Sequence, residues 1–62
     1  MTRIKVNGRV YTVTYTPDGI VAKIRVGRAE LIAIADEDTT RRDHLMRLLA
    51  RVQKRYPDAE FD

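Results

Sequence analysis

Residues 2–16 read TRIKVNGRVYTVTYT, and this stretch decides the fold because β-branched and aromatic residues surround a central Asn7-Gly8 pair. Asn-Gly is the strongest short signal for a two-residue type I′ turn, in which both residues need a positive φ. The turn predicts a β-hairpin with Val6 opposite Arg9. Alternation then gathers apolar side chains on one side of the hairpin, namely Ile4, Val6, Tyr11, Val13 and Tyr15.

A second hairpin is predicted after a Pro-Asp-Gly turn at residues 17–19. Residues 20–26 (IVAKIRV) and residues 29–35 (AELIAIA) read as its strands, and residues 27–28 (GR) form the tight turn between them. The pairing that this turn implies directs one set of side chains inward, namely Ile20, Ala22, Ile24, Val26, Ala29, Leu31, Ala33 and Ala35.

The third segment has the spacing of an amphipathic helix. Its apolar stripe consists of Leu45, Leu48, Leu49, Val52 and Tyr56. Thr40 and Asp43 resemble a capping box at the start of this helix, and Pro57 ends it.

These elements predict an α+β fold with a single ββββα domain over residues 1–57. The two hairpins form a four-stranded antiparallel sheet, either open or closed into a small SH3-like, partly open barrel, and the C-terminal helix covers one face. Residues 58–62 read as a flexible acidic tail.

The composition argues against several kinds of chemistry. The 62-residue chain has no cysteine and no serine, and His44 is its only histidine. Serine and cysteine nucleophiles are thereby excluded, and a lone histidine is a poor zinc site, so we predict no catalysis, metal or other cofactor. No apolar run approaches the roughly 20 residues that span a membrane, so we expect a cytoplasmic protein without a membrane partner.

Positive charge is unevenly distributed along the chain. The net charge is +3 and the pI is about 9.7, while the acidic stretches 36–38 and 58–62 offset stronger basicity elsewhere. On a helical projection, one arc of roughly 100° gathers His44, Arg47, Arg51, Lys54 and Arg55. The outer side of the predicted sheet is a second basic surface, with Arg3, Lys5, Lys23 and Arg25.

These cations predict phosphate binding. Because Tyr11 and Tyr15 face inward, the open sheet face lacks the stacking aromatics of a single-strand binder, which favours contact with the backbone of double-stranded DNA. We therefore expect a nucleoid-associated protein. The predicted contacts are Arg3, Lys5, Lys23, Arg25 and Arg28, followed by Arg47 and Arg51. The alternative is that these charges only solvate the surface.

A competing prediction comes from residues 31–35, LIAIA, which are apolar on both sides. In a simple meander this strand lies at the edge of the sheet, where a bare apolar strand promotes association. Either the sheet closes on itself or another chain covers the strand. The second case predicts a protein-interaction or homodimerisation module whose interface contains Val21, Ile32 and Ile34.

Short motifs resemble the 7-kilodalton archaeal chromatin proteins. Residues 5–8 (KVNG) are similar to the first hairpin of that family, residues 25–28 (RVGR) to the second, and the helix through 45–53 has the matching place. This resemblance implies an SH3-like barrel that binds duplex DNA without sequence preference. A tryptophan that the family lays on DNA falls at Ile24, which our strand register places inward. The order of elements also resembles the arm-site DNA-binding domain of tyrosine-type integrases, which likewise implies DNA binding.

Overall fold

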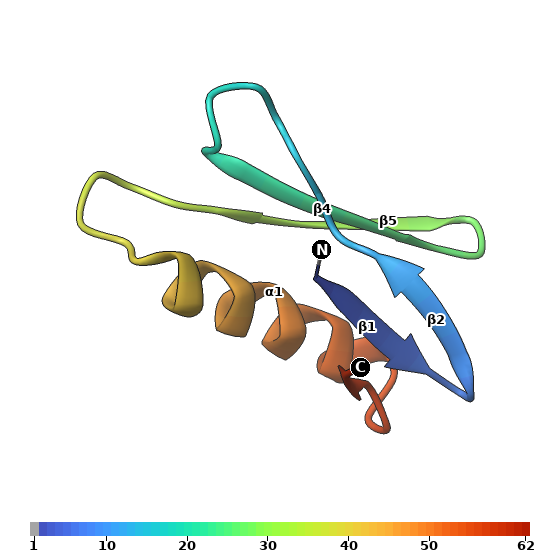
Figure 1. The fold of residues 1–62 in the computed structure, drawn as a ribbon. Helices are drawn as coiled ribbons and strands as arrows, with labels where there is room; N and C mark the ends of the chain where they lie inside the picture. The colour runs from blue at the N-terminus through green and yellow to red at the C-terminus, as the bar shows by residue number, and fades with distance from the viewer. Residues whose placement is uncertain (1) are drawn as a thin grey trace.

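The structure is a computed structural model that describes residues 2–62. In chain order its elements are β1 (Arg3–Val6), β2 (Arg9–Thr12), β3 (Thr14–Tyr15), β4 (Val21–Val26), β5 (Ala29–Ile34), α1 (Arg41–Arg55) and β6 (Glu60–Phe61) (Figure 1). The predicted α+β class, both hairpins and the C-terminal helix are confirmed. The strands form two three-stranded antiparallel sheets, in the orders β2-β1-β6 and β3-β4-β5, so the prediction of one four-stranded sheet is wrong.

The first hairpin forms where the Asn-Gly signal places it. Asn7 and Gly8 have φ values of 50° and 81°, and the strand register puts Val6 opposite Arg9. Positive φ at both positions matches the right-handed twist of the two strands, so this turn fixes the register of β1 and β2.

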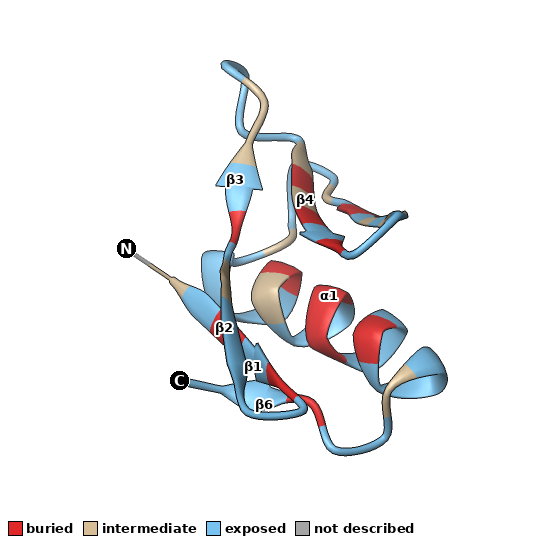
Figure 2. Ribbon diagram, turned by 90° about the vertical axis from the view of Figure 1, so that its right-hand side faces the viewer, coloured by how far each residue is buried: buried red, intermediate tan, exposed pale blue. Residues whose placement is uncertain are grey.

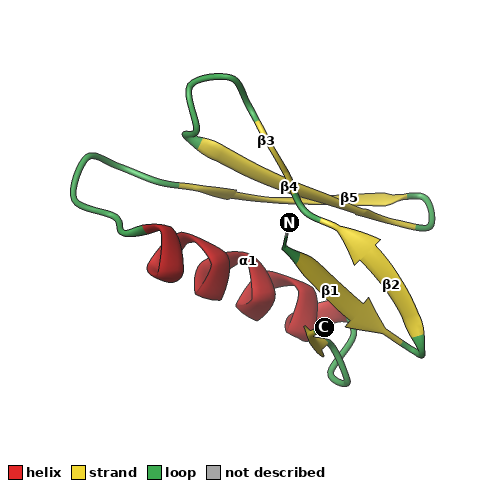
Figure 3. Cartoon of the chain, in the orientation of Figure 1, coloured by secondary structure: helices red, strands yellow, loops and turns green. Residues whose placement is uncertain are grey.

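The predicted long strand over residues 9–16 bends at Val13, and this bend creates the second sheet. The Val13 N–H donates to the carbonyl of Thr2 (3.0 Å) and so extends the first hairpin, whereas Thr14 pairs with Lys23 on β4. Val13 itself is buried in the core. One continuous segment thus serves two sheets, and Figure 3 shows how β2 and β3 diverge on either side of the bend.

The second hairpin also has the predicted register, with Val26 opposite Ala29 and Arg25 opposite Glu30. Four members of its inward set, Ala22, Ile24, Val26 and Ala33, are buried, and Leu31 packs partly buried against the core. The prediction is wrong for Ile20, which is 46% exposed. Ile20 lies one residue before β4, where its N–H donates to Asp18 Oδ1 (3.0 Å) and its carbonyl accepts from the Ala35 N–H (2.8 Å).

The helix begins after Thr40, whose side chain accepts a hydrogen bond from the Asp43 N–H (3.1 Å), and its C-cap Tyr56 precedes Pro57. Its predicted stripe packs between the two sheets (Figure 2), with Leu48 and Val52 fully buried. The core contains Ile4, Val6, Val13, Ala22, Ile24, Val26, Ala33, Leu48, Leu49, Val52 and Ala59. Ile24, the position at which the chromatin-protein resemblance places an aromatic residue on DNA, is therefore an interior residue of this fold.

The loose tail predicted after residue 57 is wrong. Glu60 and Phe61 form β6, which pairs antiparallel with β1 and places Glu60 opposite Lys5. Ala59 is 3% exposed and its carbonyl accepts from Gln53 Nε2 (2.9 Å). The segment therefore completes the domain and brings acidic residues beside β1.

Candidate functional site

A groove of about 580 Å³ separates β5 from one flank of the helix. Its apolar wall comes mainly from β5, and its basic wall comes from α1. The lining residues are Leu31, Ile32, Ala33, Ile34, Arg47, Ala50, Arg51 and Lys54, with no carboxylate among them. The groove thus combines hydrophobic surface with three cations that share one side of a helix.

The three cations, Arg47, Arg51 and Lys54, are called the cationic flank. Their i, i+4 and i+7 spacing puts them in a row, with steps of roughly 6 and 4.5 Å along the helix axis. This row offers repeated donors to a polyanion whose charges are regularly spaced. Arg47 Nη1 donates to the carbonyl of Ile34 at 3.3 Å, which ties the row to β5.

The charge of Arg47 also acts on Asp36, a carboxylate in the segment between β5 and α1. Its pKa lies below the usual value because the Thr39 hydroxyl donates to it (2.7 Å), with smaller contributions from the Asp38 N–H and from the charge of Arg47. Asp36 is therefore ionised at neutral pH and lies at the N-terminal end of the flank, whereas Arg51 and Lys54 lie farther along the helix.

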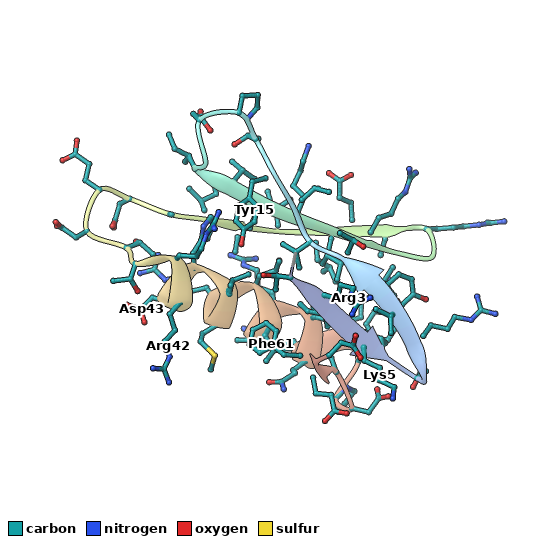
Figure 4. The ribbon with its side chains drawn as sticks, in the orientation of Figure 1. Arg3, Lys5, Tyr15, Arg42, Asp43 and Phe61 are labelled. Atoms are coloured by element: carbon teal, nitrogen blue, oxygen red, sulfur yellow. The ribbon has the colours of Figure 1, made fainter. Side chains whose placement is uncertain are left out.

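The cations predicted on one sheet face are divided between two sheets. Arg3 and Lys5 come from β1 (Figure 4), and the C-terminal segment brings a carboxylate to each: Asp62 Oδ2, just after β6, lies 3.2 Å from Arg3 Nη2, and Glu60 in β6 is opposite Lys5. The predicted continuous basic sheet surface is therefore wrong, because the bend at Val13 separates the strands and the C-terminal segment adds negative charge to one of them.

The other predicted sheet cations lie on the second sheet and its turn. Lys23 is half-buried on β4, and Arg25 is exposed but faces Glu30 across the hairpin. Arg28 is exposed in the β4–β5 turn and lines a smaller groove of about 330 Å³ with Arg9 and Tyr56. Arg28 therefore has a second cation nearby, at the end of the molecule where α1 ends. Arg9 is not among the predicted contacts, although its place directly after the hairpin turn could have indicated it.

His44 does not belong to the basic surface, contrary to the prediction. It is 3% exposed, and its Nε2 lies 2.8 Å from the carbonyl oxygen of Ala33. Its ring packs edge-on against Tyr15 with 5.8 Å between the centroids. His44 precedes Leu48 by one helical turn, so its spacing already placed it on the border of the apolar stripe.

Val21, Ile32 and Ile34 share the outer side of β4 and β5, as predicted. Ile34 is 60% and Ile32 is 39% exposed, and Val21 lies opposite Ile34 and is half-buried. Together they form an apolar patch that continues from the β5 wall of the groove onto the outer face of the sheet.

No family model, curated protein or solved structure matches the chain. Among residues 2–62, no three histidine, aspartate or glutamate side chains gather as a metal site would require. In the same part of the chain, no helix combines the length and apolar character that crossing a membrane requires.

Proposed function

We propose that this protein binds double-stranded DNA through the sugar-phosphate backbone, without catalysis and with little sequence preference. The observation that carries the proposal is the cationic flank: three cations in one row, beside a groove that contains no carboxylate. Backbone contact fits these residues because arginine donates to phosphate oxygens in a planar fork, and phosphates carry no sequence information.

The helix is favoured over the sheets as the contact surface. Arg3 and Lys5 already face Asp62 and Glu60, so DNA has to compete with these carboxylates for them. Arg28, which lines a separate groove with Tyr56 at the C-cap of the helix, is an additional candidate contact. A protein that works in this way is expected at the nucleoid, in the cytoplasm.

Fluorescence anisotropy of a labelled random-sequence duplex, titrated with protein over a range of salt concentrations, tests the proposal. Three phosphate contacts predict that the logarithm of the affinity falls against the logarithm of the salt concentration with a slope of about −3. A second duplex of unrelated sequence should bind with the same affinity. Absence of binding at low salt would overturn the proposal.

Protein binding at β5 is a second candidate function. It is favoured by the exposure of Ile34, which is 60% accessible on β5, an outer strand of the sheet that residues 2–62 form. Contiguous exposed apolar surface of this kind marks interaction sites.

A further inference from the structure

Within the described part of the chain, residues 2–62, one long edge of the second sheet has backbone hydrogen-bonding groups that no other strand pairs with. In the order β3-β4-β5, β5 is an outer strand. Along an antiparallel strand, the N–H and C=O groups of successive residues point alternately toward one neighbouring strand and toward the opposite side. The Ala35 N–H donates to the carbonyl of Ile20, so the backbone groups of Ala35 point toward the β4 side. The amides and carbonyls of Glu30, Ile32 and Ile34 therefore point away from β4, and Arg47 meets the last of these carbonyls.

The groove lies beside this open edge. Figure 1 shows α1 running along β5, and both elements contribute to the groove lining. A strand added to β5 continues the sheet, and its alternate side chains point to opposite faces. One set lies over the cationic flank, and the other set lies beside Ile32 and Ile34.

These two environments define the chemistry of the added strand. The side chains toward the helix meet Arg47, Arg51 and Lys54 and are matched by carboxylates. The side chains on the outer face meet exposed isoleucines and are matched by apolar residues. The protein's own C-terminal segment has this alternation of acidic and apolar residues, since Asp58, Glu60 and Asp62 alternate with Ala59 and Phe61. This segment includes β6, which pairs antiparallel with β1.

A second copy fits this edge poorly. Pairing β5 with β5 of another molecule brings the two cationic flanks together across the two-fold axis, and like charges repel there. DNA phosphates can pair with the cations. They only accept hydrogen bonds, so they offer no donor to the backbone carbonyls of Glu30 and Ile32.

We propose that the β5–α1 groove binds an extended peptide of a partner protein, which adds antiparallel to β5 with acidic residues toward the helix and apolar residues outward. The inference specifies the partner chemistry of the second candidate function and does not rest on DNA binding.

The probe is a fluorescein-labelled peptide of about eight residues that alternates glutamate and valine, long enough to span β5. Its affinity is measured by anisotropy. Arg51→Glu should weaken binding at least tenfold. Arg42→Glu, the control, has the same charge change at an exposed helix position that points away from β5 (Figure 4), and its affinity should stay within about twofold.

Two methylated peptides test the strand pairing itself. In antiparallel pairing, the valines lie opposite Glu30, Ile32 and Ile34, and their amides point to β5. N-methylation of the valine amides should abolish binding, whereas N-methylation of the glutamate amides should preserve it. Equal effects of the two modifications, or no binding of the unmodified peptide, would overturn the proposal.

Parallel titrations separate this inference from DNA binding. A protein that binds the duplex but not the peptide contradicts the inference alone, and a protein that binds the peptide but not the duplex contradicts the proposed function alone. Self-association that the peptide displaces, detected by sedimentation velocity, would assign the edge to a second copy and overturn the proposal.

Discussion

Leu48→Ala is expected to bring the protein close to its unfolding midpoint at room temperature. Leu48 is completely buried on the helix face that packs between the two sheets. Truncating a fully buried leucine costs about 2–5 kcal/mol, since the lost transfer energy adds to that of the cavity. A core of this size rarely supplies more than about 3–5 kcal/mol in total, so this single change removes most of the free energy of unfolding.

Thermal and urea unfolding followed by circular dichroism measure this effect. Met46→Ala is the matched control, because Met46 lies on the same helix and is 51% exposed. Its free energy of unfolding should change by no more than about 0.5 kcal/mol. Equal losses in the two variants would contradict the packing of α1 between the sheets.

Replacing both Arg47 and Arg51 with glutamine is expected to reduce the affinity for duplex DNA by on the order of a hundredfold, because two charge-assisted contacts to phosphate are lost. The slope of affinity against salt should become shallower by about two units. Both side chains are exposed, and the single hydrogen bond lost among residues 2–62 is the exposed one from Arg47 to the Ile34 carbonyl, so the variant should still fold, as circular dichroism can verify.

The control for this variant removes the same charge elsewhere. Lys5→Gln combined with Arg42→Gln lowers the net charge equally, at exposed positions outside the groove. Its salt slope should match that of the unmodified protein. An equal loss of affinity in both double variants would mean that only net charge matters, and the flank would then have no special role.

Local turn and cap chemistry made most of the fold predictable. Asn7-Gly8 fixes the first hairpin, and Thr40 with Pro57 bounds the helix, because each signal acts within a few residues of itself. Alternation within the second hairpin was correct for the same reason: the tight turn sets the register.

The features that sequence analysis got wrong depend on contacts between distant segments. The bend at Val13 is stabilised by two different pairing partners, Thr2 and β4, and no residue signal marks it. The pairing of β6 with β1 joins opposite ends of the chain, and its two-residue length gives no strand pattern. Both errors affected the site, because they separated the basic sheet residues and placed carboxylates beside Arg3 and Lys5.

The cationic flank was partly predictable because helical spacing alone aligns Arg47 with Arg51. Lys54 was recognised in the same basic arc but was not ranked as a contact, since the groove that unites the three cations exists only when β5 packs beside the helix. His44 was misplaced because its spacing lies at the border of the apolar stripe, and the Ala33 carbonyl that receives it belongs to another element.

We propose that the cationic flank of the helix, rather than either sheet face, contacts DNA. The most direct measurement is an NMR titration of ¹⁵N-labelled protein with an unlabelled random-sequence duplex, followed through backbone amides and arginine side-chain signals. The largest shifts should occur at Arg47, Arg51 and Lys54, with smaller shifts at Arg28. Shifts confined to β1 around Arg3 and Lys5, or to the outer face at Lys23 and Arg25, would contradict it.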